Sequence, residues 1–142
     1  MLQFSVKNLK EHQEEGVILC STLIREGGDI YLAFGTQSDQ LLIYDSNLEL
    51  IQMFEFGNWV RALKAVDFTS NGYDKLFVGS ADKTVRVFSF NTAIGEFEEE
   101  YELNIPSLVS HLDVCDLENS GNLDLIIASN DRYLRIFDAE FY

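Results

Sequence analysis

Proline and cysteine are nearly absent from this sequence. Its 142 residues include one Pro and two Cys, and no stretch is of low complexity. Disordered chains are poor in aliphatic and aromatic residues, whereas this chain is 46% hydrophobic and 13% aromatic. The composition therefore predicts one folded domain over residues 1–142, and the many Phe and Tyr residues favour strands over helices.

Basic residues are also scarce. The chain has 10 Lys and Arg against 24 Asp and Glu, which gives a formal net charge of −14. Such a surface repels phosphate groups, so we expect neither nucleic acids nor anionic membranes as partners. The charge would suit a basic protein surface or a hard cation, or it keeps a sheet-rich protein soluble.

The two cysteines, Cys20 and Cys115, lie inside apolar, strand-like runs and lack the CxxC spacing of redox and zinc sites. We interpret both as reduced core thiols, which indicates a reducing compartment. No apolar run reaches the length of a membrane span, and residues 1–10 lack the apolar core of a signal peptide. We therefore expect a cytoplasmic protein.

The strongest pattern is an internal repeat. Residues 32–45, 76–89 and 125–138 align without gaps, with starts 44 and 49 residues apart. Each segment has a short apolar strand, a polar turn with an Asp, and a second strand that contains an aromatic residue near its end. Tandem hairpins with a period of about 40–50 residues are typical of β-propeller blades.

Further strands complete these units. An upstream strand and a glycine-containing turn precede each hairpin, and an outer strand follows two of them, at residues 49–56 and 96–103. The sequence therefore predicts an all-β propeller of four-stranded antiparallel blades. The predicted blades are residues 17–56, residues 60–103 and residues 108–138, the last of which lacks its own outer strand.

Residues 2–7 are predicted to supply that strand, because Leu2, Phe4 and Val6 alternate with polar residues. Three blades are too few for a closed ring, which typically has about 4–8. We therefore predict that two copies join head to tail into a six-bladed ring, each N-terminal strand closing the last blade of the other copy. The alternatives are a fragment of a longer propeller and a ring completed by another protein.

Two stretches resemble known propeller repeats. Residues 79–88, Gly-Ser-Ala-Asp-Lys-Thr-Val-Arg-Val-Phe, resemble a hairpin of a WD repeat, but the Trp and the Gly-His dipeptide of that repeat are missing. The buried network of WD repeats is therefore not expected. Residues 116–129 are similar to the FG-GAP repeat of integrin α-like propellers. Together the two features look like the propellers of Bardet-Biedl (BBSome) subunits, which implies a propeller fold and says less about function.

The FG-GAP resemblance implies a calcium site in the third unit. The calcium-binding form of that repeat runs Asp-x-Asp-x-Asp-Gly-x-x-Asp-Leu, and its oxygen side chains suit an ion that takes about 6–8 oxygen ligands. The corresponding candidate ligands are Asp116, Glu118, Ser120, Asn122 and Asp124. The alternative is a polar hairpin turn in which Asp116 caps backbone amides.

Two further groups of charged residues lie on predicted strands. A run of glutamates lies on the outer strand of the second unit: Glu96, Glu98, Glu99, Glu100 and Glu102. It either guards the sheet edge against pairing or binds a basic peptide. We expect Phe97, Tyr101 and Leu103 to share the opposite face. Arg86 and Arg135 are predicted to pair with acidic residues of a neighbouring blade.

The sequence contains no Gly-rich phosphate loop, Gly-x-Ser-x-Gly elbow or His-Glu-x-x-His segment. We therefore predict a non-catalytic scaffold, without a required cofactor, that binds a protein or peptide. The alternatives are a calcium-binding propeller and an enzyme with its active site at the channel mouth. The candidate interaction residues are Leu2, Phe4, Val6 and Trp59, although Trp59 could instead pack between blades.

Overall fold

The computed structural model describes residues 3–139, which form eleven strands in three sheets. The first sheet contains β1 (Ile18–Glu26), β2 (Asp29–Thr36), β3 (Gln40–Tyr44) and β4 (Leu50–Glu55). The second contains β5 (Val60–Val66), β6 (Lys75–Ser80), β7 (Thr84–Asn91) and β8 (Glu96–Asn104). The third contains β9 (Val109–Cys115), β10 (Asp124–Ser129) and β11 (Leu134–Asp138).

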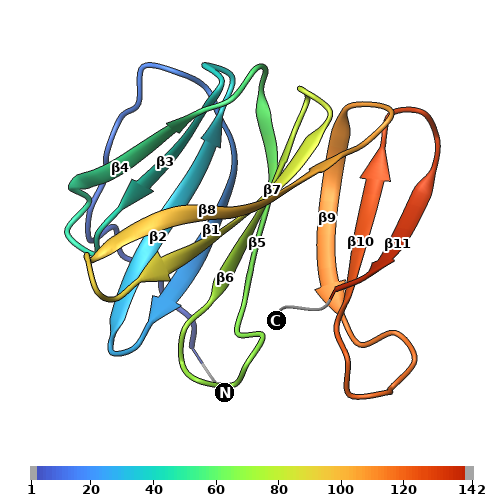
Figure 1. The fold of residues 1–142 in the computed structure, drawn as a ribbon. Helices are drawn as coiled ribbons and strands as arrows, with labels where there is room; N and C mark the ends of the chain where they lie inside the picture. Colours follow the sequence, from blue (N-terminus) through green and yellow to red (C-terminus); the bar gives the residue numbers. More distant parts are fainter. Residues whose placement is uncertain (1–2, 140–142) are drawn as a thin grey trace.

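Each sheet is an antiparallel meander in which consecutive strands are hydrogen-bonded neighbours. The sheets stand face to face and fan apart, as the blades of a propeller do (Figure 1). The first strand of the middle sheet, β5, contacts the first strands of both neighbours, β1 and β9. The structure thus confirms the predicted all-β propeller fold, and we name the three sheets blade 1, blade 2 and blade 3.

Blade 3 has three strands in the described part of the chain, and its last strand, β11, has an open edge. Residues 3–15 form no strand but run along blade 1 (Figure 1), where Lys10 Nζ donates to the Ser46 carbonyl at 3.3 Å. The predicted strand at residues 2–7 therefore does not form within a single chain; Leu2 lies outside the described residues. Its pairing with a second copy stays a prediction.

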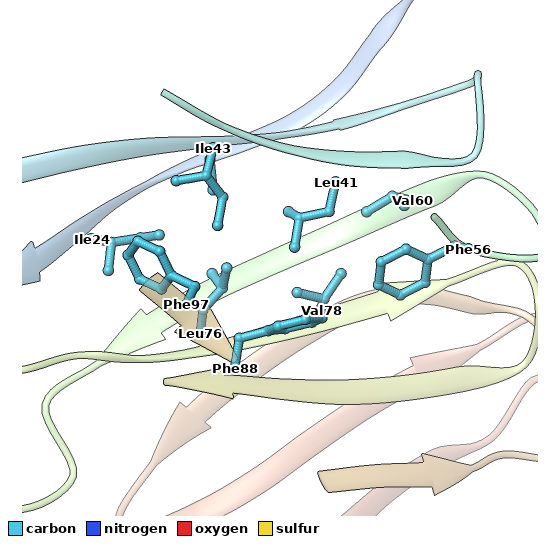
Figure 2. Packing of buried hydrophobic residues seen from close by; sticks show 10 residues of the cluster. Ile24, Leu41, Ile43, Phe56, Val60, Leu76, Val78, Phe88 and Phe97 are labelled. Atoms are coloured by element: carbon cyan, nitrogen blue, oxygen red, sulfur yellow. The ribbon is translucent and has the colours of Figure 1, made fainter. Parts of the chain in front are cut away.

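The core lies between the blades. Because successive strand residues point to opposite sides, each blade has two apolar faces. We name the face toward the preceding blade the leading face and the other the trailing face. Figure 2 shows the cluster between blades 1 and 2, where Leu41 and Ile43 lie opposite Leu76, Val78 and Phe88. A second cluster joins blades 2 and 3: Ala62, Phe77, Val85, Val87, Ile105, Val109, Leu112, Val114, Leu125 and Ile127.

Glycine allows neighbouring blades to approach closely. A Cβ atom at Gly79 of β6 would lie 2.6 Å from Val109 Cγ1, and one at Gly35 of β2 would lie 2.6 Å from the Val60 carbonyl oxygen. Both glycines therefore let the second strand of one blade contact the first strand of the next. The equivalent position in blade 3 is Ala128, which is also small.

A second contact between blades 1 and 2 joins the hairpin after β1 to the loop before β6. The Arg25 N–H donates to Asp74 Oδ2 at 2.7 Å, and the Gly27 N–H donates to the Gly72 carbonyl at 2.9 Å. Glu26 is 3% exposed there, and its carboxylate accepts no hydrogen bond from the described residues. Burial, with the nearby Asp74 as a smaller cause, raises the pKa of Glu26 to about 8.

The hairpins of blades 2 and 3 share one construction. Arg86 Nη2 lies 3.4 Å from Asp82 Oδ2 in blade 2, and Arg135 Nη2 lies 2.7 Å from Asp131 Oδ2 in blade 3. The serine bonds differ: Ser80 Oγ accepts the Asp82 N–H at 3.0 Å, whereas Ser129 Oγ donates to Asp131 Oδ1 at 2.6 Å. A Ser-Asp-Arg group therefore fixes this turn without a Trp, although that group could not be foreseen from the WD resemblance.

The arginines pair within their own blades, so the predicted pairing with a neighbouring blade is wrong. Arg86 lies within 3.6 Å of three carboxylates of blade 2: Asp82, Glu99 and Glu102. Its contacts with blade 1 are the Glu55 carbonyl at 3.2 Å and the Phe56 ring at 4.1 Å. The tight turn places the Asp four residues earlier within reach, which the strand pattern alone does not reveal.

Candidate interaction surfaces

The trailing face of blade 3 is an open apolar surface. Strand pairing places Ile126 beside Ile136 and Ala128 beside Leu134 on this face. Leu134 and Ile136 are exposed, and Ile126 and Ala128 are partly so. The equivalent side chains of blade 2, such as Phe77 and Val87, are buried against blade 3. Blade 3 thus presents at the surface the positions that form an interface elsewhere in the fold.

The leading face of blade 1, at the other end of the molecule, is also apolar. Leu23, Leu32 and Tyr44 form one row across it, and Phe34, Leu42 and Met53 form the next. Leu23 and Met53 are exposed, whereas Leu42 and Tyr44 are buried. The segment before β1 covers part of this face, because the rings of His12 and Tyr44 lie 5.1 Å apart. Leu32 and Phe34 are partly buried as well, so the exposed part of this face is mainly Leu23 and Met53.

A groove of about 700 Å³ lies between β8 of blade 2 and β11 of blade 3. Its walls are mainly apolar and aromatic: Phe77, Val85, Val87, Tyr101, Leu103, Leu125, Phe137 and Ala139. Lys75, Glu100 and Asp138 line it as well, and Lys75 Nζ lies 2.6 Å from Glu100 Oε2. The sequence patterns did not predict this groove. The missing outer strand of the third unit was the feature that could have indicated it.

A β-bulge in the β7–β8 pairing decides which side chains face the groove. Phe90 pairs with Phe97 and Val87 with Tyr101, with the register shift between Val87 and Phe88. Phe97 therefore faces blade 1, whereas Tyr101 and Leu103 face blade 3. The prediction that Phe97, Tyr101 and Leu103 share one face is wrong, because strict alternation fails across a bulge.

The glutamate run on β8 is largely paired. Glu99 and Glu102 lie within 3.6 Å of Arg86, and Glu100 pairs with Lys75. Glu98 accepts a hydrogen bond from Asn91 Nδ2 at 3.2 Å. The run therefore fixes the outer strand of blade 2 as well as charging the rim.

The candidate calcium ligands lie in a turn that holds itself together. Asp116 Oδ1 accepts the Ser120 N–H at 2.9 Å and Oδ2 accepts the Gly121 N–H at 2.6 Å. These hydrogen bonds hold the pKa of Asp116 below its usual range. Asp124 Oδ2 accepts the Leu117 N–H at 3.1 Å, while Glu118 and Asn122 are exposed.

This geometry is that of the alternative, an Asp that caps backbone amides. Asp67 makes the same bonds in blade 2, to the N–H groups of Asn71 and Gly72. Within residues 3–139 no group of three or more His, Cys, Asp or Glu side chains could hold a metal ion. The hydrogen bonds of Asp116 thus match the capping alternative, while the calcium site stays a prediction.

The other candidate interaction residues are separate from one another. Phe4 and Val6 lie before β1 and are 92% and 83% exposed. Trp59 lies between β4 and β5, where its carbonyl accepts the Ala81 N–H at 2.8 Å and its side chain is 40% exposed. No described hydrogen bond or ring contact joins Trp59 to Phe4 or Val6. Across the described residues, no helix is long and apolar enough to cross a membrane.

Comparison with known proteins gives a structural likeness without a family. No family model and no curated protein matches the chain. Among solved structures, the Saccharomyces cerevisiae protein Sqt1, a WD40 propeller, matches with a TM-score of 0.59 and 19% sequence identity. The match covers 78% of this chain and 28% of Sqt1. It supports the propeller fold, and the chain corresponds to under a third of the length of Sqt1.

Proposed function

We propose that the protein is a non-catalytic protein–protein interaction scaffold, a half-propeller that two copies complete by joining head to tail. The observation that carries the proposal is the pair of apolar end faces, of which the blade 3 face is open and the blade 1 face is partly covered by the segment before β1. The likeness to a WD40 propeller supports the same reading of the fold. Six blades lie within the usual range of about 4–8 for closed rings.

The two end faces are equivalent to faces that already pack together inside the chain. Ile126 and Ile136 of blade 3 stand where blade 2 has Phe77 and Val87, and Ala128 stands where it has Gly79. Blade 1 has Leu32 and Tyr44 where blade 2 has Leu76 and Phe88. Trailing face against leading face therefore repeats the geometry of the two internal interfaces. A heterologous contact of this kind closes into a ring when the rotation matches the number of blades.

Apolar contact is needed because charge opposes association. Each copy carries a net charge of −14, so two copies repel one another at long range. The polar groups of the blade turns are engaged in holding those turns, as Asp116 and Asp131 show. These contacts support a structural role for the turn carboxylates. The remaining acidic outer surface suits a partner of opposite charge, such as a basic protein or peptide.

Sedimentation velocity over a range of protein concentrations tests the proposal. Wild-type protein should sediment as a dimer, and Ile136→Glu should weaken the dimer at least about tenfold because a charge enters an apolar interface. Ile94→Glu is the matched control: Ile94 and Ile136 are both 56% exposed, but Ile94 lies in the β7–β8 turn, away from both end faces. A wild-type monomer at all concentrations, or equal effects of the two variants, would contradict it.

A further inference from the structure

The rim between blades 1 and 2 shows what normally closes such a groove. Phe97 of the outer strand β8 is 2% exposed and packs against Tyr31 and Phe90, with ring centroids 5.4 and 5.1 Å away. Its N–H donates to Gln52 Oε1 at 2.7 Å, and its carbonyl accepts from Gln52 Nε2 at 3.1 Å. An outer strand with an inward aromatic side chain therefore seals this interface.

The rim between blades 2 and 3 lacks that strand in the described residues. The groove lies there, with Tyr101 and Leu103 on one wall and Leu125 and Phe137 on the other. The third strands of blades 1 and 2 each pair with a fourth strand, whereas within residues 3–139 no strand pairs with the outer edge of β11. An unpaired strand edge beside an apolar groove is suited to the addition of one more strand.

The segment before β1 has the chemistry to fill it. Phe4 and Val6 alternate with Gln3, Ser5 and Lys7, so an extended conformation places both apolar side chains on one face. Residues 3–10 contain two lysines and no acidic residue, in a chain with an excess of acidic residues. The groove has Glu100, Asp138 and Lys75 in its lining, and Lys75 Nζ pairs with Glu100 Oε2 at 2.6 Å. Asp138 therefore leaves the lining with one excess negative charge, which the positively charged segment complements.

The segment cannot reach the groove of its own chain while it keeps its contacts with blade 1. Lys10 is held at Ser46 of blade 1, and the three residue steps from position 7 to position 10 span at most about 10 Å. Blade 3 lies two sheet spacings away, about 20 Å. In a head-to-tail ring, blade 3 of the other copy lies one spacing from blade 1, about 10 Å, which the segment can bridge.

We propose that residues 3–7 of a second copy add to β11 as the fourth strand of blade 3, with Phe4 seated in the groove against Phe137 and Tyr101. This inference rests on the head-to-tail ring proposed above. An exchanged strand would then stabilise the ring in addition to the contact between end faces. Phe4 would take the place that Phe97 has in blade 2.

Hydrogen exchange measured by mass spectrometry, at protein concentrations below and above dimer formation, tests the exchange. We expect amides of residues 3–7 and of β11 to exchange about tenfold or more slowly in the dimer. Phe4→Asp should remove this protection and weaken the dimer at least about tenfold. Leu9→Asp is the matched control, because Leu9 is 83% exposed in the same segment but lies outside the proposed strand.

The outcomes separate this inference from the proposed function. A dimer whose residues 3–7 stay unprotected overturns the exchanged strand and leaves the ring standing. Protection that is the same at every concentration overturns it too, because it means pairing within one chain. Equal effects of Phe4→Asp and Leu9→Asp also overturn it. If no dimer forms at any concentration, the proposed function itself fails and the exchanged strand with it.

Discussion

At the scale of single residues, Gly79 shows how closely the blades pack. A methyl group at this position would lie against Val109 and Leu112 of β9. We expect Gly79→Ala to lower the free energy of unfolding by roughly 1–3 kcal/mol, the usual cost of overpacking a core. Denaturant titration measures this, with Gly28→Ala as the control because no atom lies within 4 Å of a Cβ there. Equal stabilities of the two variants would contradict the packing argument.

Glu26 makes stability depend on pH. Burial raises its pKa from 4.5 to about 8. The neutral form therefore favours folding; its contribution is fully present below pH 4.5 and is lost as the pH rises through about 8. Because of this, the wild type should be more stable at pH 5 than at pH 9, with roughly 1–3 kcal/mol of the difference due to Glu26.

Glu26→Gln should remove that part of the pH dependence, as measured by denaturant titration at the two pH values. Glu96→Gln is the control, because Glu96 is an exposed residue of β8. The change in net charge with pH affects both variants alike. If Glu26→Gln and Glu96→Gln show the same pH dependence, Glu26 is not the group responsible.

At the scale of elements, variants of the Asp116 turn distinguish a calcium site from an Asp that caps backbone amides. If Asp116 caps backbone amides, Asp116→Asn should lower the melting temperature of the wild-type protein at pH 7, and Asp67→Asn should act similarly in blade 2. Millimolar calcium should leave the melting temperature unchanged. A rise on adding calcium that Asp116→Asn abolishes would instead show a calcium site, since a ligand stabilises the fold that binds it.

The strands were largely predictable because the repeat carries two kinds of signal. Alternation of apolar residues marks each strand. A small residue near the end of the second strand and an Asp after it mark the turn, as at Gly79 and Asp82. Pairing order then follows from short connections between neighbours. The strands and their order of pairing could therefore be predicted from the sequence.

Which side chains are exposed, and which blade they face, could not be predicted in the same way, because both depend on contacts between blades. The bulge beside Val87 reverses the facing of Tyr101 relative to Phe97 without any mark in the alternation. Glu26 is of a residue type that usually lies at the surface, yet the loop before β6 buries it. The alternation around Phe4 predicts a strand, but residues 3–15 form none within a single chain.

At the scale of the whole molecule, residues 3–139 form a stack of three blades with an apolar face at each end and, among these residues, an open edge at β11. An interface that repeats twice inside the chain is available a third time between copies. If two copies use it, the ring has no open end face, and the exchanged strand leaves no blade incomplete. A closed ring presents its loops and rim to partners, which is the basis of the proposed scaffold function.

Small-angle scattering on a concentration series tests the closed ring most directly. A closed ring of two copies has twice the 16.2 kDa chain mass and a radius of gyration of about 19 Å, as expected for one compact body of that size. A mass of one chain at every concentration, with a radius of about 14 Å, would contradict it. So would a mass that keeps rising with concentration, because stacking without closure produces open filaments.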